Sequence, residues 1–349
     1  MRRVLLICML SFLMCFTSAL VVSAETVETY IETTTETEVL LDGLTIVTTT
    51  TVTTVITDGI SEVTTTFNVE EFQADVTPTP NVEPTPTPKP KPTPKPIPTV
   101  KVYTTKATAS AAILKGLLSH KKTIEIVVSS SVAENNSEAR ELLTGAYAVN
   151  KNSSSKAGDY IRWNIEQWST HYQTEGKTTK LALNIEYGTS VAQEKKLDTE
   201  IKATLKKLNI SKLSDYKKVK AIHNYIINRA SYDTTYTNYT AYNTLINKSA
   251  VCQGYALLAY RMFNEAGIPC RLIVGQANGY HAWNIVKVSG KWYNIDLTWD
   301  DPITYNGKPM LIYTYFLKSD VAFSNHFRDT AYRTKEFVKA YPIAKTSLK

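Results

Sequence analysis

Cysteine is scarce in this chain, with only four among 349 residues. Two of them, Cys8 and Cys15, lie in the apolar N-terminal run, so the rest of the chain holds only Cys252 and Cys270. This excludes a fold that depends on several disulfides, and a body of this size does not need them. One of the two remaining cysteines is therefore more interesting as a thiol. A Cys252–Cys270 bridge that inactivates the thiol is the alternative.

Clusters of metal-ligating residues are also lacking. The chain has five histidines, and His120, His171 and His326 have no partner at ligand spacing. No acidic cluster suits calcium, so we predict no metal, and no motif indicates a cofactor. Basic patches interleaved with aromatic residues are missing as well, which argues against a nucleic-acid partner.

Only one run is apolar and long enough to enter a membrane, residues 4–22, and it follows Arg2 and Arg3. The small residues at the end of Val22-Ser23-Ala24 complete the pattern of a secretory signal, residues 1–24. We therefore predict a secreted protein, extracellular or associated with a cell wall. An uncleaved signal that anchors the chain is the alternative, and it is the only membrane contact that we expect.

Positive charge is absent from residues 25–76, which carry eleven Asp and Glu and no Lys or Arg. Because the whole chain has a net charge of +7 and the signal holds two arginines, residues 77–349 carry +16. A basic body outside a cell suits anionic cell-wall polymers or lipid headgroups as partners, unless the acidic segment shields it. The oligomeric state is unknown from the sequence, although edge pairing of the acidic segment would drive self-association.

The acidic segment is rich in Thr, Val and Glu. Two Asp-Gly pairs, Asp42-Gly43 and Asp58-Gly59, separate three β-branched runs, a strong hairpin pattern. Few large apolar groups are available for burial, so a small β-meander and a disordered segment are both open interpretations. Residues 77–100 follow with ten prolines and predict an extended polyproline II linker.

Residues 101–349 form the predicted globular body, with an N-terminal lead-in at 101–210 and a catalytic domain at 211–349. Apolar spacing and cap residues predict helices over Val191–Leu208, Ser214–Asn228 and Ser249–Gly267. Strands are predicted at Thr123–Val128, Lys180–Tyr187, Cys270–Val274, His281–Val288 and Trp292–Thr298. Helices followed by an antiparallel sheet indicate an α+β fold.

The third predicted helix places Cys252 in its first turn. Free backbone N–H groups and the positive end of the helix dipole favour a thiolate there. Gly254 would permit another backbone to approach closely. A helical cysteine is more often a small core residue than a nucleophile, so this position alone is a moderate signal.

The hairpin after this helix strengthens the signal. A two-residue turn at Ser289-Gly290 pairs Val288 with Lys291 and directs His281 and Asp296 to the same sheet face. Trp283 lies between them on that face and could exclude water. An Asp at this position can hold an imidazole in one tautomer and stabilise its charged form. Contact between Cys252 and His281 does not follow from register.

Four segments of this region resemble the bacterial transglutaminase-like superfamily: Ala250–Ala256 (AVCQGYA), Gly267–Cys270 (GIPC), Gly279–Asn284 (GYHAWN) and Trp292–Pro302 (WYNIDLTWDDP). The resemblance extends over about Leu213–Asp320. It implies a papain-like α+β core in which the nucleophile helix packs on an antiparallel sheet. It also implies that Cys252 is the nucleophile, His281 the base and Asp296 the orienting acid.

Together with the predicted signal, the resemblance implies an extracellular thiol enzyme acting on amide bonds of peptides or proteins through a thioacyl intermediate. Water resolves that intermediate in a protease, and an amine does so in a transamidase. A catalytically inactive module that binds cell-wall or surface polymers is the alternative. For the oxyanion we expect the backbone N–H of Cys252, with Gln253 or Tyr242 as candidates for a second donor. Asp300 and Asp301 are expected to shape a turn, although either could replace Asp296.

Overall fold

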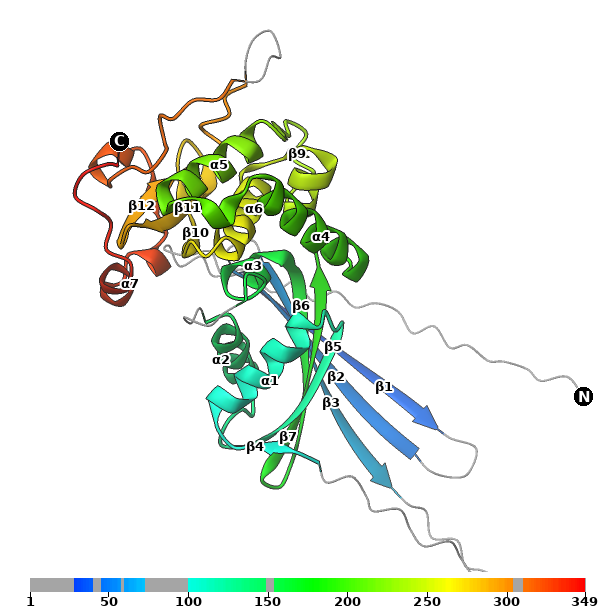
Figure 1. The fold of residues 1–349 in the computed structure, drawn as a ribbon. Helices are drawn as coiled ribbons and strands as arrows, with labels where there is room; N and C mark the ends of the chain where they lie inside the picture. Colours follow the sequence, from blue (N-terminus) through cyan, green and yellow to red (C-terminus); the bar gives the residue numbers. More distant parts are fainter. Residues whose placement is uncertain are drawn as a thin grey trace, which may run out of the picture.

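The structure is a computed structural model that describes residues 100–148, 154–303 and 310–348, together with the backbone of three strands between residues 28 and 72 (Figure 1). The predicted signal, both Asp-Gly turns and nearly all of the proline-rich linker lie outside the described residues. The structure combines helices with sheets in which most neighbouring strands are antiparallel, which agrees with the predicted α+β class.

The first half of the molecule is built on a seven-stranded sheet with the order β1-β2-β3-β6-β7-β5-β4. The three N-terminal strands pair antiparallel as a meander, one of the two interpretations left open by the sequence, and β3 then pairs with β6 in parallel through Glu62–Thr64 and Trp168–Thr170. The acidic segment therefore extends a larger sheet instead of standing alone. The strands of the seven-stranded sheet are β1 (Glu28–Val39), β2 (Thr45–Thr57), β3 (Ile60–Phe72), β4 (Val102–Tyr103), β5 (Thr123–Ser129), β6 (Ile165–Glu175) and β7 (Thr178–Tyr187).

Two helices cover one face of this sheet, α1 (Lys106–Leu118) and α2 (Asn136–Ala146) (Figure 1). Alternate residues of β5 point toward them, so that Ile124, Ile126 and Val128 are buried while Glu125 is exposed. This strand and its alternation follow the sequence, whereas both helices lie outside the sequence-based predictions. A short helix, α3 (Asp159–Asn164), then leads into β6.

Three longer helices belong to the second half. They are α4 (Val191–Lys207), α5 (Asp215–Ile227) and α6 (Cys252–Glu265), close to the predicted ranges. Ser190 caps α4 through a capping box with Gln193. The third helix begins three residues later than predicted, because Ser249–Ala250 (β9) pairs in parallel with Ser231–Tyr232 (β8) before the helix starts.

A four-stranded antiparallel sheet with the order β12-β11-β10-β13 carries α6 on one face. Its ladder pairs Val288 with Lys291, which confirms the predicted hairpin register. The last pair of the ladder is Asn284 with Ile295, so Asp296 lies one position beyond it. The strands are β10 (Cys270–Gln276), β11 (Tyr280–Val288), β12 (Lys291–Ile295) and β13 (Phe327–Arg328), and a last helix, α7, covers Lys335–Ala340.

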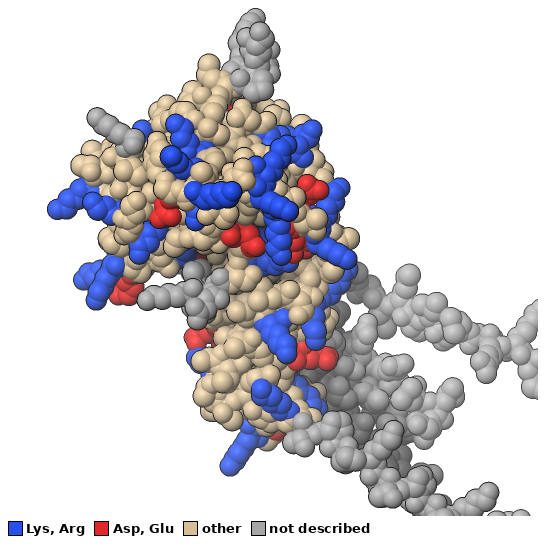
Figure 2. Space-filling view, viewed as in Figure 1, with Lys and Arg blue, Asp and Glu red and all other residues tan. Residues whose placement is uncertain are grey.

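Figure 2 shows blue Lys and Arg side chains gathered across the second half of the molecule, where α4 and α5 lie. The exposed lysines of residues 191–217 are Lys195, Lys196, Lys202, Lys206, Lys207, Lys212 and Lys217, here called the basic face. Among the described residues, no helix is both long enough and apolar enough to cross a membrane.

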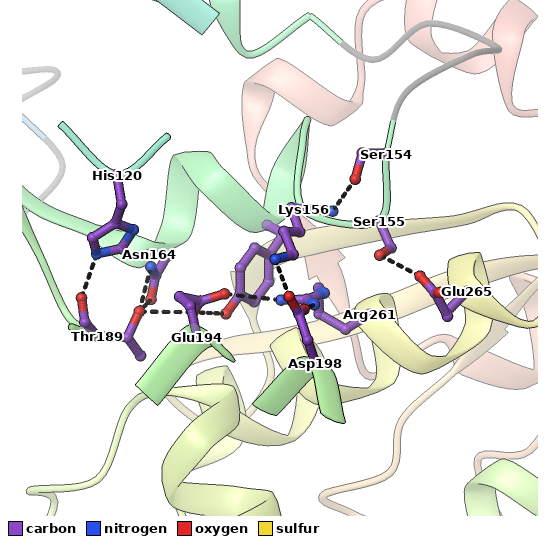
Figure 3. A network of polar contacts seen from close by, with 11 residues as sticks. His120, Ser154, Ser155, Lys156, Asn164, Thr189, Glu194, Asp198, Arg261 and Glu265 are labelled. Atoms are coloured by element: carbon purple, nitrogen blue, oxygen red, sulfur yellow. Dashed lines mark hydrogen bonds and ion pairs between the residues drawn. The ribbon is translucent and has the colours of Figure 1, made fainter. Parts of the chain in front are cut away.

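A buried polar network joins the two halves (Figure 3). At its centre is Arg261 of α6, only 2% exposed, which donates to Glu194 of α4 at 3.1 Å and pairs with Asp198. Tyr160 of α3 donates to the same Glu194 at 2.5 Å, so both carboxylate oxygens have partners. Buried charges persist only when they are paired in this way, and the network therefore fixes α6 against α3 and α4.

Candidate active site

The thiol of Cys252 begins α6, with Val251 as the cap residue. Val251 N donates to Asn238 O at 2.9 Å, and the cap is not closed by a side chain. The first-turn N–H groups of a helix have no partner within the helix, so the thiol stands beside backbone donors. Cys252 itself is half-buried.

Gly254 lets the first turn of α6 pack closely against the segment that precedes it. A Cβ there would lie 2.5 Å from Ala250 Cβ, 2.8 Å from Thr244 Oγ1 and 3.0 Å from Thr240 O. Only glycine fits such spacing without displacing the neighbouring segment. The prediction that Gly254 permits a close backbone approach is therefore confirmed, and the neighbour is protein backbone and side chain.

His281 on β11 and Asp296 after β12 lie in direct contact. His281 Nε2 lies 2.8 Å from Asp296 Oδ2, and both residues are at most 5% exposed. Because Nε2 faces the carboxylate, Nδ1 is the ring nitrogen available to the thiol. Cys252 lies close enough to this imidazole to contribute to raising the pKa of His281. Cys252, His281 and Asp296 are here called the triad.

The electrostatics of the pair favour its charged form. Burial lowers the pKa of His281, but the charge and hydrogen bond of Asp296, with a further contribution from Cys252, raise it to about 10. Burial likewise raises the pKa of Asp296, but His281 and His326 outweigh it and bring the value to about 2. An imidazolium facing a carboxylate is thus the favoured state at neutral pH.

Asp296 leaves the ladder because its own carboxylate forms a turn. Asp296 Oδ1 accepts hydrogen bonds from the backbone N–H of Thr298 at 2.9 Å and of Trp299 at 3.2 Å. The strand therefore ends before Asp296, earlier than the predicted Thr298. As a result, Trp299 lies over His281, with ring centroids 5.6 Å apart, a cover that the sequence interpretation had not assigned.

Trp283 lies beneath the imidazole. Its ring stacks on His281 with centroids 6.1 Å apart and planes 19° apart, and it is 1% exposed. The Trp283 side chain therefore excludes water from the inner side of the His281–Asp296 pair, as the sequence predicted. Because it is buried, it does not line an open cleft.

The two candidate oxyanion donors have other contacts. Gln253 Nε2 donates one hydrogen bond to Trp163 O at 3.1 Å, which leaves its second N–H. Tyr242 is half-buried, with Lys196 Nζ 5.9 Å from its ring centroid. The second oxyanion donor stays a prediction. Tyr232 is closer to the chemistry, since burial first and the neighbouring Cys252 second raise its pKa to about 12.

The remaining predicted residues have structural partners. Asp300 accepts from Tyr315 N and lies 3.0 Å from His223 Nε2, with both side chains fully buried. Asp301 accepts a 2.6 Å bond from Tyr255, and burial raises its pKa to about 6. Asp296, rather than either of them, faces His281. Cys270 is 3% exposed within β10, and both it and Cys252 are free thiols.

His326 corrects one sequence-based expectation. It was expected to have no partner, yet its Nε2 lies 3.0 Å from Asp296 Oδ2, the oxygen that also faces His281. No local pattern could have found it, because 30 residues separate it from Asp296. His281, Asp296 and His326 could also hold a metal, since their ligand atoms lie within 4.8 Å of one another. The predicted lack of ligand spacing therefore does not hold for His326.

A cavity of about 960 Å³ lies elsewhere, on the first sheet, where Tyr103, Glu125, Tyr172 and Lys180 contribute to its lining. No triad residue lines it. Cavity size alone does not identify a reactive centre. A thiol beside an imidazole that pairs with a carboxylate supplies the nucleophile, the base and the orienting acid. The candidate active site is therefore the triad.

Comparison with known proteins places the triad inside a recognised family region. Residues 202–297 match the model of the transglutaminase-like superfamily. The chain is 29% identical over 140 residues to kyphoscoliosis peptidase of Mus musculus, covering 33% of this chain and 21% of that protein. For the Homo sapiens protein of the same name the identity is 27% over 167 residues, covering 41% of this chain and 25% of that protein. The chain thus spans a quarter or less of the length of these relatives.

Two solved structures are also similar to this chain. One, described as the crystal structure of a TGase, is 19% identical, with a TM-score of 0.30 over 50% of either chain. The other, from Cytophaga hutchinsonii, is 22% identical, with a TM-score of 0.27 over 40% of this chain and 59% of that chain. The family match at residues 202–297 includes all three triad residues.

Proposed function

We propose that this chain, whose residues 202–297 match the transglutaminase-like family model, is a thiol enzyme that cleaves or exchanges amide bonds of peptides or proteins through a thioacyl intermediate. The observation that carries the proposal is the charged His281–Asp296 pair beside a thiol at a helix N-terminus. A cysteine in that setting is a nucleophile at neutral pH.

The reaction would begin with attack of Cys252 Sγ on the substrate carbonyl carbon. The tetrahedral oxyanion is held by the Cys252 backbone N–H and by a second donor, for which Gln253 is a candidate. His281 then gives its proton to the departing amine, the C–N bond breaks, and the acyl group stays on sulfur.

In the second half the acyl group leaves the sulfur. His281, now neutral, accepts a proton from water or from a substrate amine as that nucleophile attacks the thioester carbonyl. Breaking the C–S bond restores the thiolate beside the imidazolium. Water gives hydrolysis and an amine gives transamidation, and the same residues serve both. Asp296 keeps the imidazole oriented and stabilises its charge throughout.

We also propose where this enzyme acts. The predicted signal and the proline-rich linker support export, with the linker holding the folded body away from the cell surface at ~3.1 Å per residue. The enzyme would then act on extracellular or wall-associated peptides or proteins.

The test uses two variants with opposite expectations. Cys252→Ala removes the nucleophile, and Cys270→Ala removes the other free thiol, which is buried in β10. Peptide-amide hydrolysis and incorporation of a labelled primary amine into a protein acyl donor are measured in parallel. We expect the Cys252→Ala protein to lose both activities and the Cys270→Ala protein to keep them. Turnover that persists without Cys252 would overturn the proposal.

The basic face favours a second candidate function, a binding module for anionic wall polymers without turnover. That candidate predicts salt-sensitive binding of a polyphosphate-type polymer by the wild type and the Cys252→Ala variant alike. It also predicts an ordinary alkylation profile for Cys252. Binding that is unaffected by salt would argue against it.

A further inference from the structure

Two imidazoles share one oxygen of the triad carboxylate. Asp296 Oδ2 lies 2.8 Å from His281 Nε2 and 3.0 Å from His326 Nε2, while Oδ1 accepts the two backbone N–H groups of Thr298 and Trp299. A carboxylate accepts about four hydrogen bonds, so this one is saturated. Of these four partners His281 is the one whose pKa the neighbouring Cys252 also raises, and the other three contacts fix the carboxylate.

The fold brings His326 to this carboxylate through a short strand. His326 directly precedes β13, which pairs with β10 where Gly275 faces Arg328, and Gly275 is itself the ladder partner of His281. A Cβ on Gly275 would lie 2.0 Å from Phe327 O, so only glycine lets β13 approach at this position. Arg328 then holds the segment by donating to Asn294 and Asp320, at 2.9 and 3.0 Å.

The His326 ring is held on its other sides as well. Its side chain has no exposed surface, and its ring lies 3.9 Å from that of Phe323 and 4.6 Å from that of Trp299. Nδ1 lies 2.9 Å from Asn325 Oδ1, so both ring nitrogens have polar partners. A histidine confined in this manner can fix the oxygen that it contacts.

We propose that His326 is a positioning residue of the thiol reaction: by holding Asp296 Oδ2 it directs the carboxylate at His281, so that the working unit is Cys252–His281–Asp296–His326. This inference rests on the proposed function for its kinetic consequence. The hydrogen-bond geometry on which it stands is independent of the substrate.

Three variants of the full chain separate positioning from packing. His326→Phe keeps an aromatic ring between Phe323 and Trp299 and removes the donor to Asp296. His326→Gln restores an amide donor near the place of Nε2. His223→Phe is the matched control, because it removes the equally buried donor to Asp300, 3.0 Å away.

Turnover is the first readout. We expect the His326→Phe protein to lose about 10- to 100-fold in kcat with little change in KM, the range for loss of an outer hydrogen-bond partner of a working histidine. The His326→Gln protein should regain most of that loss, and the His223→Phe control should keep the wild-type kcat. Equal losses in the His326→Phe and His223→Phe proteins, or no loss in the His326→Phe protein, would overturn the proposal.

The second readout needs no substrate, so failure of the proposed function and failure of this inference are distinguishable. NMR titration of the histidine rings follows His281 directly. Positioning predicts that the His281 midpoint falls by about one pH unit in the His326→Phe protein, because a carboxylate that is no longer held turns away from the imidazole and stabilises its charge less. The midpoint should return toward the wild-type value in the His326→Gln protein and stay in place in the His223→Phe control. An unchanged or higher midpoint in the His326→Phe protein would refute positioning, even if the wild type proves active.

Discussion

Replacing Asp296 with Asn removes the charge that faces His281 and keeps the shape of the side chain. In the native protein burial lowers the pKa of His281, and Asp296 outweighs burial and raises that pKa to about 10. In the variant burial remains and the charge is gone. We therefore expect His281 to titrate below the ordinary value of 6.5. At neutral pH the imidazole would be neutral, and no positive charge would stand beside Cys252.

The expected effect is large. One pH unit corresponds to about 1.4 kcal/mol, so a fall from about 10 to below 6.5 corresponds to about 5 kcal/mol. Breaking a buried ion pair costs ~3–5 kcal/mol, which is of the same order. NMR titration of the histidine rings in the full chain measures the midpoint, and a His281→Gln variant assigns the signal. The chain has only five histidines, so the spectrum is simple.

The same substitution has a pH-dependent effect on stability, and its sign follows from the two shifts. The raised pKa of His281 means that its contribution is complete below 6.5 and is lost as pH rises toward about 10. The lowered pKa of Asp296 means that its contribution is present above 3.8 and is lost as pH falls toward about 2. Urea unfolding should therefore show the largest destabilisation by Asp296→Asn between pH 3.8 and 6.5.

Asp300→Asn is the matched control, because Asp300 lies in the same turn and contacts His223 instead. We expect the His281 midpoint to stay where it is in that variant. A wild-type His281 that titrates near 6.5, or an Asp296→Asn protein with an unshifted midpoint, would refute the reasoning.

Two further predictions concern the supports of α6. Gly254→Ala should lower the free energy of unfolding by ~1–3 kcal/mol, because the new methyl group meets Ala250 and Thr244 within 2.8 Å. Urea denaturation measures this loss, and an unchanged midpoint would contradict the tight packing. Arg261→Met should lower the free energy of unfolding by ~3–5 kcal/mol, since it leaves Glu194 without its buried counter-charge. A double variant that also carries Glu194→Gln should recover part of the loss, and strict additivity of the two changes would contradict the pairing.

The parts of the fold that the sequence predicts are those set by local spacing. The helix at α4 follows from apolar residues at Leu197, Ile201 and Leu205, which are all buried in the structure. The β11–β12 hairpin follows from a two-residue turn, since that turn fixes every pair beyond it. Its register brought His281 and Asp296 to one face, even though the strand ends at Ile295.

The first half was harder to predict because its local patterns are weak and part of its strand pairing joins segments that are distant in the sequence. α1 has Thr, Ser and Ala at many positions, so its sequence lacks the contrast between apolar and polar faces that marks a surface helix. The acidic segment was left open between a meander and disorder, because it has little to bury alone. Its pairing with β6 spans only Glu62–Thr64 and depends on a strand far along the chain, so no spacing within the segment could indicate it.

In the candidate site, too, the contact set by local spacing was predicted from the sequence, whereas the contacts between distant segments were not. His281 and Asp296 are 15 residues apart on one hairpin, and the turn determines their encounter. The docking of Cys252 on that hairpin came only from family resemblance, because the helix precedes the sheet and its packing depends on the whole core. His326 reaches Asp296 through β13, whose place beside β10 requires Gly275. A glycine without a side chain and a two-residue strand give no periodic pattern, so the residue that holds the triad carboxylate is detectable only when the chain is folded.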